Sequence, residues 1–332
     1  MRAPAFWWQG NGGRLLAPFA AIYGAIAAMR LRSPGGKVGI PVICVGNLTV
    51  GGAGKTPVAL TLGRLLLAEN KHPFFLTRGY GGRLAGPVRV DRAIHRAADV
   101  GDEPLLLAEV APTIVARDRL AGARAAQRDG ADVVVMDDGF QNPSLAKDLA
   151  VLVIDGRRAI GNGRVFPAGP LRAPAEVQLA RAQAVLVVGA PSHTVASILE
   201  IARRHGAAIF HGSLEPDRAC IAALGQRRVF AFAGIGDPEK FYATLREAGV
   251  AVAEHASFPD HHRYTPADAR ALIARADSAG LALLTTEKDY ARIAGDAPLA
   301  ELAARSSVLR VQLQVKEEPE FRRLILSATA GR

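Results

Sequence analysis

From residue 40 onward, short runs of apolar and β-branched residues alternate with stretches of helical periodicity. The apolar runs contain few charges, which is typical of strands that are buried on both faces of a sheet. We expect strands at residues 42–45, 74–76, 113–115, 133–136, 149–154 and 184–188. The helical stretches include residues 56–67, 104–110 and 119–128. This alternation predicts an α/β fold with a mostly parallel sheet and helices on both of its faces.

A polar stretch at residues 213–228, which contains Pro216, interrupts this pattern. A second series of apolar runs begins at Val229. We therefore predict an N-terminal segment at 1–36, a larger α/β domain at 37–212, a linker at 213–228 and a smaller α/β domain at 229–332.

The N-terminal segment has a different pattern. Phe6-Trp7-Trp8 precede residues 15–29, which carry no charge, and Arg30 and Arg32 follow. A helix of about 15 residues is about 22 Å long, shorter than the roughly 30 Å hydrocarbon core of a bilayer. The late start of the apolar run and the lack of a clear cleavage site argue against a signal peptide. A buried helix of the globular domain is the other alternative. We favour an apolar helix at a membrane surface, with tryptophans and arginines at headgroup level.

Composition narrows the class of protein. The chain has 332 residues, of which 49% are hydrophobic and 22% charged, so global disorder is excluded and two packed domains are feasible. The net charge of +10 suits a polyanionic partner, either nucleic acid or an anionic membrane. Since no aromatic-basic nucleic-acid motif is present, we expect a membrane surface, no nucleic acid and no obligate protein partner. Cys44 and Cys220 lack metal-ligand spacing and fit a reducing, cytosolic compartment.

The strongest chemical signal follows the first predicted strand. Residues 46–57 read Gly-Asn-Leu-Thr-Val-Gly-Gly-Ala-Gly-Lys-Thr-Pro. A glycine-rich turn between strand and helix presents backbone N–H groups to phosphate oxygens, lysine adds a charge, and the threonine hydroxyl can bind Mg²⁺. The general motif has Gly where this chain has Thr49, and a glycine turn without a ligand is the alternative. We expect a P-loop for nucleotide phosphates formed by Thr49, Val50, Gly51, Gly52, Ala53, Gly54, Lys55 and Thr56.

Residues 133–141, Val-Val-Val-Met-Asp-Asp-Gly-Phe-Gln, resemble a Walker B strand, in which a carboxylate at the strand end reaches the Mg²⁺ held by the P-loop threonine. The alternative is a pair of acids in a turn. Three further segments offer chemistry. Arg78 and Tyr80 lie in a glycine-rich loop, Asp102 and Glu103 open a helix, and Arg172 follows Pro-Leu. Taken alone, these segments are also compatible with a surface loop, a helix cap and an ion pair.

The predicted smaller domain contains Asp260, His261 and His262 in a row, and residues 285–289 read Thr-Thr-Glu-Lys-Asp. Three adjacent side chains cannot easily surround one metal ion, so a titratable histidine that faces the cleft between the domains is the better interpretation. The second segment lacks the residue that a guanine-specificity motif has between Lys and Asp. GTP specificity is rejected on that ground.

Taken together and in this order, these motifs closely resemble the tetraacyldisaccharide 4'-kinases, the lipid A 4'-kinases of Gram-negative bacteria. The resemblance rests on residues 46–57, Thr-Arg-Gly-Tyr-Gly, Gly-Asp-Glu-Pro, Asp-Asp-Gly-Phe-Gln, Pro-Ala-Gly-Pro-Leu-Arg, Gly-Ile-Gly, Asp-His-His and Thr-Thr-Glu-Lys-Asp. It extends from the N-terminal apolar helix to about Asp289. Thr49 at the start of the P-loop is itself like the family.

The resemblance implies ATP-dependent phosphorylation of the 4'-hydroxyl of a tetraacyl glucosamine disaccharide 1-phosphate, with Mg²⁺, at the cytoplasmic face of the inner membrane. It implies that the N-terminal helix is monotopic or spans the bilayer once. The site roles it implies are these: Asp102, His261, Lys55 and Arg172 catalytic; Thr56, Asp137, Glu103 and Asp138 metal-binding; Arg78, Tyr80, Arg119 and Gln141 acceptor-binding. Two positions depart from the family: Asn142 stands where it commonly has His, and Ala173 where it commonly has Glu.

Two other functions stay open on the residues alone. One is a soluble P-loop kinase that acts on a small sugar or nucleotide, against which the N-terminal apolar segment argues. The other is a non-catalytic, nucleotide-gated binding protein, which gives Asp102 no role.

Overall fold

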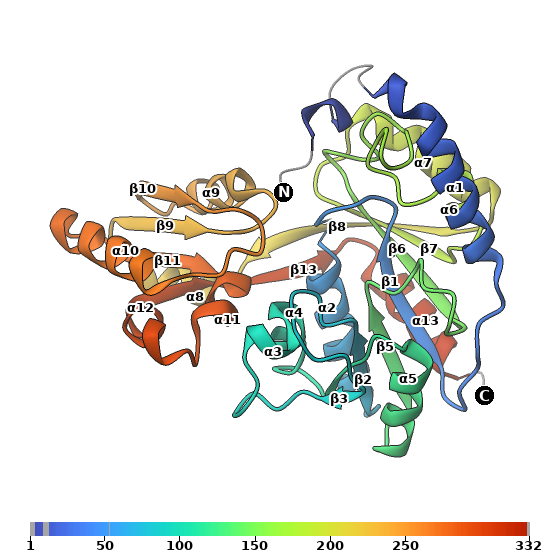
Figure 1. Cartoon of the computed structure of the whole chain (residues 1–332), viewed down its shortest axis with the longest axis horizontal. Helices are drawn as coiled ribbons and strands as arrows, with labels where there is room; N and C mark the ends of the chain where they lie inside the picture. The colour runs from blue at the N-terminus through green and yellow to red at the C-terminus, as the bar shows by residue number, and fades with distance from the viewer. Residues whose placement is uncertain (1–3, 9–12, 53, 331–332) are drawn as a thin grey trace.

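The structure, a computed structural model, describes residues 4–8, 13–52 and 54–330. The described chain forms two α/β units, each built around its own sheet (Figure 1). The predicted fold class is confirmed, including the N-terminal apolar helix.

The larger sheet has nine strands in the order β13-β8-β7-β6-β1-β5-β2-β4-β3. Only β3 and β13, at its two edges, pair antiparallel with their neighbours. Its central strands are buried throughout, except for Asp155 at the end of β6, which explains their near-continuous apolar sequences. The strand bounds are β1 Val42–Asn47, β2 Pro73–Thr77, β3 Val88–Arg89, β4 Thr113–Val115, β5 Val133–Asp137, β6 Leu149–Asp155, β7 Ala184–Val188, β8 Ala208–Pro216 and β13 Val311–Val315.

Successive residues of β1 face opposite sides of this sheet and enter two different cores. Cys44 packs in the core covered by α5 (Arg119–Arg128), α6 (Ala175–Leu179) and α7 (His193–Arg204). Ile43 packs in the core covered by α2 (Lys55–Ala68) and α13 (Glu318–Thr329). Helices therefore cover both faces, as the alternating pattern predicted.

The smaller unit contains a parallel four-stranded sheet in the order β10-β9-β11-β12. Its strands are β9 Val229–Ala233, β10 Val252–Ser257, β11 Ala282–Thr286 and β12 Ser306–Leu309. One face is covered by α8 (Arg218–Leu224) and α9 (Pro238–Glu247). The other is covered by α10 (Pro266–Ala279), α11 (Glu287–Ile293), η3 (Ala297–Leu299) and α12 (Ala300–Arg305).

The domain boundaries differ from those predicted at two points. The predicted linker, 213–228, contains the end of β8 and all of α8, and the last part of the chain does not stay in the smaller unit. Instead β13 pairs antiparallel with β8 in the larger sheet, and α13 packs on that sheet. Figure 1 shows β8 and β13 running side by side between the two units. Pairing between strands so far apart in the chain leaves no local sequence signal, which is why the boundary was missed.

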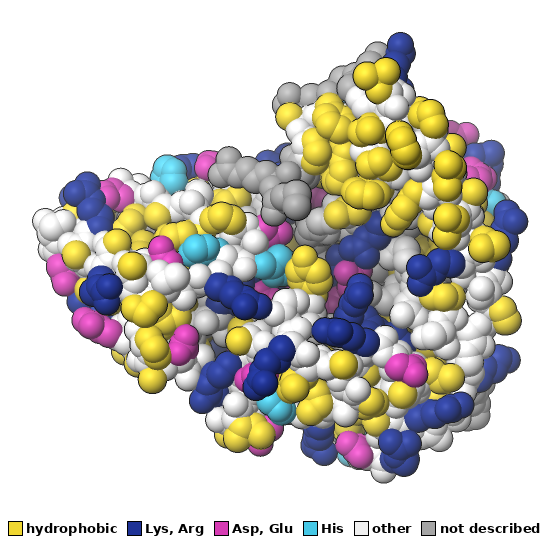
Figure 2. Space-filling model, viewed as in Figure 1, with side chains coloured by type: hydrophobic (Ala, Val, Ile, Leu, Met, Phe, Trp, Pro, Cys, Tyr) yellow, Lys and Arg dark blue, Asp and Glu magenta, His cyan; other side chains and the backbone are white. Residues whose placement is uncertain are grey.

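The N-terminal segment forms η1 (Ala5–Trp7), η2 (Arg14–Leu16) and α1 (Ala17–Arg32). Residues 14–32 are long and apolar enough to cross a membrane, and most of this helix is exposed. Large apolar side chains gather on its outer side (Figure 2), among them Leu15, Phe19, Ile22, Ile26 and Met29. The inner side carries small residues that border an open groove of about 570 Å³, and Arg164, Val165, Ala168 and Pro174 line its other side. This groove contains none of the predicted phosphate-binding residues.

The remaining short helices, α3 (Ala97–Val100) and α4 (Asp102–Leu107), lie between β3 and β4 in the chain. Helix α4 contacts α11 of the smaller unit. The start of α4 thereby lies against the smaller unit, and α4 also contacts α2, which follows the P-loop at the carboxyl end of β1. Ligands of doubly wound sheets bind at such strand ends.

Candidate active site between the two units

The P-loop has the backbone that its glycines predict. Gly51 and Gly54 have φ values of +110° and +84°, a region that side chains with a Cβ rarely adopt. A Cβ on Gly51 or Gly52 would meet no atom within 4 Å, so the loop borders open space. Helix α2 starts at Lys55, and its N-terminal N–H groups favour an anion there. Ala53, the fifth residue of the predicted loop, lies outside the described residues.

The loop is held by contacts with its surroundings. Asn47 Nδ2 donates to the carbonyl of Gly51 at 3.1 Å, and the N–H of Val50 donates to the carbonyl of Pro170 at 2.7 Å. Arg172 Nε donates to the carbonyl of Thr49 at 3.0 Å. Residues 170–172, which lie far from the P-loop in the chain, thus fix its first half.

Thr56 and Asp137 meet at the carboxyl ends of β1 and β5. Thr56 Oγ1 donates to Asp137 Oδ2 at 3.3 Å, whereas Asp137 Oδ1 is buried and has no hydrogen-bond partner within the described part of the chain. Burial, followed by the negative charge of Glu103, raises the pKa of Asp137 to about 7. A buried carboxylate oxygen without a partner, next to a hydroxyl, fits a hard cation such as Mg²⁺.

Among the described residues, no three His, Cys, Asp or Glu side chains converge in a way that would hold a metal ion by themselves. This fits a Mg²⁺ ion that is bound through one or two protein groups and the phosphates of a nucleotide.

Asp138 has two cationic neighbours instead. Arg172 donates to both of its carboxylate oxygens, at 2.8 and 3.2 Å, and Lys55 Nζ lies 3.7 Å from Oδ1. Burial opposes its ionisation, but Lys55 and Arg172 outweigh this effect and hold the pKa of Asp138 at about 2. Burial also lowers the pKa of Lys55. Asp138 has a left-handed backbone with φ +53°, an uncommon conformation that concentrates at functional sites.

Gln141 lies inside this cluster. Its Nε2 donates to the carbonyl of Asn47 at 2.8 Å and to Gln178 Oε1 at 2.9 Å, and its Oε1 accepts from Arg172 at 3.2 Å. Both polar atoms of the Gln141 side chain therefore have partners near the P-loop. In this arrangement Gln141 has no free N–H group for the predicted contact with the acceptor.

Arg119, the first residue of α5, is only 2% exposed. Its Nη1 donates to the carbonyl of Ala116, and its buried Nε has no partner among the residues described. Burial and the nearby charge of Arg78 both lower the pKa of Arg119. Two adjacent arginines, with Arg78 exposed and a buried N–H group unpaired, form an arrangement suited to an anion.

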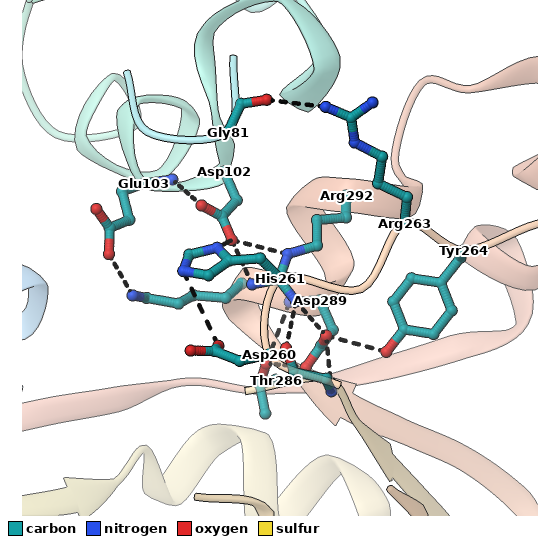
Figure 3. A network of polar contacts seen from close by, with 12 residues as sticks. Gly81, Asp102, Glu103, Asp260, His261, Arg263, Tyr264, Thr286, Asp289 and Arg292 are labelled. Atoms are coloured by element: carbon teal, nitrogen blue, oxygen red, sulfur yellow. Dashed lines mark hydrogen bonds and ion pairs between the residues drawn. The ribbon is translucent and has the colours of Figure 1, made fainter. Parts of the chain in front are cut away.

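Asp102 begins α4 and is only 4% exposed. Residues of the smaller unit surround its carboxylate (Figure 3). Oδ2 accepts from Arg292 Nε at 2.7 Å and also from Arg292 Nη2, and His261 Nδ1 lies 3.5 Å away. Burial disfavours the anion, but His261 and Arg292 outweigh it and lower the pKa of Asp102. In turn, the carboxylate of Asp102 raises the pKa of His261.

The two adjacent histidines have different environments. The backbone of His261 is left-handed, with φ +56°, and its N–H donates to the carbonyl of Gly234 at 3.0 Å. Its ring also contacts Tyr80 of the larger unit, with centroids 4.9 Å apart. His262 points into its own unit, where Nε2 lies 3.2 Å from Asp268 and the ring stacks on Phe258. Of the two, only His261 lies beside Asp102.

Glu103 is also paired across the interface, because Lys288 Nζ donates to its Oε1 at 2.5 Å. Lys288 and Arg292, and the buried Asp289 between them, were not assigned a role from the sequence. A signal was present: Lys288 and Arg292 are four residues apart directly after a strand, so a helix places both on one face. What the sequence did not indicate was which acids that face would meet.

The two positions that depart from the family make local contacts. Asn142 Oδ1 accepts from the N–H and the hydroxyl of Ser144, at 2.9 and 2.7 Å. Ala173 is buried, and its carbonyl accepts from Gln178 Nε2 at 2.7 Å. Neither residue contacts Asp102, Asp137 or Lys55 through a hydrogen bond.

The chain is similar to known proteins over nearly its whole length. Residues 13–330 match the family model described as Tetraacyldisaccharide-1-P 4'-kinase. The chain is 53% identical over 330 residues to a tetraacyldisaccharide 4'-kinase of Rhodopseudomonas palustris strain BisA53, covering 98% of this chain and 96% of that protein. It is 50% identical over 335 residues to the protein of the same name from Bradyrhizobium sp. strain BTAi1, covering 100% of this chain and 96% of that protein.

Among solved structures, the chain is similar to the "apo" form of LpxK from Aquifex aeolicus in complex with ATP. The TM-score is 0.75 at 28% identity, and the match covers 96% of this chain and 99% of that one.

Proposed function

The chain belongs to the tetraacyldisaccharide-1-P 4'-kinase family, and from that membership we propose that it transfers the γ-phosphoryl group of ATP to the 4'-hydroxyl of a tetraacyldisaccharide 1-phosphate in lipid A synthesis. The observation that carries the proposal is a P-loop whose following helix, α2, contacts α4, at the start of which the buried Asp102 carboxylate lies beside His261. The P-loop supplies a site for the phosphate donor, and Asp102 and His261 supply groups that can accept a hydroxyl proton.

On the donor side, the N–H groups of the loop from Thr49 to Thr56 bind the phosphates of ATP, and Lys55 contacts the β- and γ-phosphate oxygens. Thr56 and Asp137 would hold Mg²⁺, which is supported by the buried Oδ1 of Asp137, an atom without a hydrogen-bond partner among the described residues. When bound, this ion neutralises charge on the β- and γ-phosphates. Asp138 and Glu103 act nearby through water, since both already have cationic partners.

The transfer needs positioning and charge neutralisation more than covalent participation of the protein. Nδ1 of His261 faces Asp102, so Nε2 is the nitrogen that accepts the proton of the 4'-hydroxyl. The 4'-oxygen then bonds to the γ-phosphorus, while the bond between that phosphorus and the bridging oxygen of ADP breaks. Arg172 leaves Asp138 in part to contact the phosphoryl group during this step.

For the acceptor, Arg78 and Arg119 bind phosphate or sugar oxygens, and Tyr80 lies against the sugar beside His261. Gln141 acts indirectly, by fixing the P-loop at Asn47. The exposed apolar side of α1 and the groove behind it support an acceptor that carries acyl chains. We therefore assign the protein to the cytoplasmic face of the inner membrane, anchored through α1.

The decisive test incubates the purified full-length protein with γ-labelled ATP, Mg²⁺ and tetraacyldisaccharide 1-phosphate in detergent micelles. Labelled lipid that carries a second phosphate at the 4'-position, identified by mass spectrometry, is the expected product. The Lys55→Met variant serves as the control, with little or no labelled lipid expected. The same assay is repeated with a small water-soluble sugar in place of the lipid; label on that sugar and none on the lipid would contradict the proposal.

A further inference from the structure

The segment after β11 occupies a central place in the interface between the two units, yet the mechanism above gives it no role. Helix α11 contacts α4, and its residues Lys288 and Arg292 lie one turn apart on the side that faces Asp102 and Glu103. Each of the two cations takes one of the two acids: Arg292 pairs with Asp102 and Lys288 with Glu103. Two adjacent acids of one unit are thus neutralised by one helix of the other.

The buried carboxylate of Asp289 fixes the position of Arg292 by a hydrogen-bonded ion pair. Its side chain has no exposed surface, and Oδ1 accepts from the N–H of Gly234 at 3.0 Å, the hydroxyl of Tyr264 at 2.9 Å and Arg292 Nη1 at 2.8 Å. Oδ2 accepts from Thr286 Oγ1 at 2.6 Å. Asp289 therefore has partners on both oxygens and cannot rotate without breaking several buried hydrogen bonds.

The guanidinium of Arg292 donates hydrogen bonds to both units (Figure 3). Nη1 is used within the smaller unit, where it donates to Asp289 and, at 2.6 Å, to the carbonyl of Gly234. Nε and Nη2 remain, and both donate to Asp102 Oδ2. Because the guanidinium is planar and rigid, fixing one edge of it sets where the other edge presents its two donors.

The same carbonyl of Gly234 also accepts from the N–H of His261. One short segment therefore holds both groups that approach Asp102 Oδ2: the Arg292 guanidinium at 2.7 Å and the His261 ring at 3.5 Å. The second oxygen, Oδ1, accepts from the N–H of Glu103 at 2.9 Å, so the carboxylate is oriented from both ends.

A plain structural tie between the units is the simpler explanation, and other contacts already provide one. Lys288 pairs with Glu103, and Arg263 Nη2 donates to the carbonyl of Gly81 at 3.1 Å. Arg292 differs from both because its partner is the buried carboxylate assigned to proton handling. Arg292 is also held within its own unit by the buried Asp289, which a contact between the units alone does not require.

Resting on the function proposed above, we infer that Arg292 is a positioning residue for the phosphoryl transfer: anchored by Asp289, it orients the Asp102 carboxylate toward His261. The motif Thr-Thr-Glu-Lys-Asp then contributes Asp289, the anchor of Arg292, which lies three residues beyond the motif.

The test compares Arg292→Met with Arg292→Lys and with Arg263→Gln, measuring kcat and the KM for ATP and for the lipid. For Arg292→Met we expect kcat to fall by about 100-fold with both KM values within about threefold, because general acid–base assistance is typically worth 100-fold or more. Arg292→Lys keeps the positive charge but loses the paired N–H donors of the guanidinium. We expect its kcat to be about tenfold higher than that of Arg292→Met. Arg263→Gln removes a contact between the units without touching Asp102, and kcat should stay within about threefold.

Two results would overturn the inference: equal losses in Arg292→Met and Arg263→Gln, or KM values that rise while kcat is retained. If Arg292→Met does not fold, as judged by thermal melting, Tyr264→Phe replaces it. That variant removes one hydrogen bond to Asp289, and we expect kcat to fall about fivefold with KM unchanged; an unchanged kcat would contradict the inference. If the unmodified protein phosphorylates no lipid, the proposed function fails and the inference fails with it. If Arg292→Met phosphorylates the lipid with an unchanged kcat, the inference alone is overturned.

Discussion

The P-loop side and the Asp102 side of the candidate site differ in where their residues come from. The P-loop side, formed by Lys55, Thr56, Asp137, Asp138 and Arg172, lies entirely within the larger unit. Its carboxylates stand at the end of β5, beside the β1 strand that leads into the loop. The Asp102 side takes its carboxylate from the larger unit and its histidine and arginine from the smaller one.

This difference has an energetic consequence. A buried carboxylate that loses its cationic partner costs several kcal/mol, typically about 3–5. Asp138 keeps Arg172 and Lys55 whatever the smaller unit does, whereas Asp102 has Arg292 and His261 only when the units are docked. Docking therefore stabilises the Asp102 side directly, and it reaches the P-loop side mainly through Glu103 and Lys288, whose charges raise and lower the pKa of Asp137. We therefore expect ATP binding and phosphoryl transfer to respond to different substitutions.

The largest expected effect separates the two sides directly. Asp102→Asn should lower kcat by about 1,000-fold and leave ATP affinity within about twofold, because it removes the carboxylate that pairs with both His261 and Arg292 but that has no hydrogen bond to the described P-loop residues. Lys55→Met should weaken ATP binding itself, since a buried cation at the start of α2 is lost. Isothermal titration with ATP, alongside the lipid assay, measures both. If Asp102→Asn also abolishes ATP binding, the two sides are not independent.

A smaller effect is expected within the Asp102 side. His261→Ala should lower kcat by about 100-fold, because it removes the proposed proton acceptor. His262→Ala is a matched control: it lies next in the chain but contacts Asp268 and Phe258, so we expect kcat to change by less than about threefold. Steady-state kinetics on both variants decides the assignment. A larger loss in His262→Ala would mean that the proton acceptor has been placed one residue too early.

The smallest effect is a pH dependence that differs between the two sides. The hydrogen bond to Asp102 raises the pKa of His261 above its ordinary value of 6.5, so the neutral form that accepts a proton is lost as pH falls through this raised value. At saturating Mg²⁺, kcat should be constant at high pH and fall about tenfold per pH unit below a midpoint above 6.5.

The P-loop side should respond to Mg²⁺ instead. Burial raises the pKa of Asp137 to about 7, so protons compete with the ion below that pH and higher Mg²⁺ concentrations should restore its binding. Rate profiles at low and saturating Mg²⁺ distinguish the two groups. If Mg²⁺ moves the whole decline of kcat, then Asp137 and not His261 is responsible for it.

The fold was largely predictable because its signals are local. Buried parallel strands such as β1 and β5 read as apolar runs, and the glycines before Lys55 mark a turn whose φ values exclude most other residues. The return of β13 to the larger sheet was not predictable, because an edge strand of five residues carries no signal for its partner. The prediction that the smaller domain extends from residue 229 to residue 332 was wrong for that reason.

By itself, the sequence determined which residues stand at strand ends and loops, and hence that a phosphate-binding loop, an acidic strand end and a reactive histidine segment exist. Only the tertiary structure decided which of these meet. It brought His261 and not His262 to Asp102, turned Gln141 toward the P-loop, and gave Lys288 and Arg292 their acids. The physical reason is one of range: backbone conformation and strand burial follow from neighbours in the chain, whereas ion pairs follow from distances of a few ångströms between segments that are far apart in it.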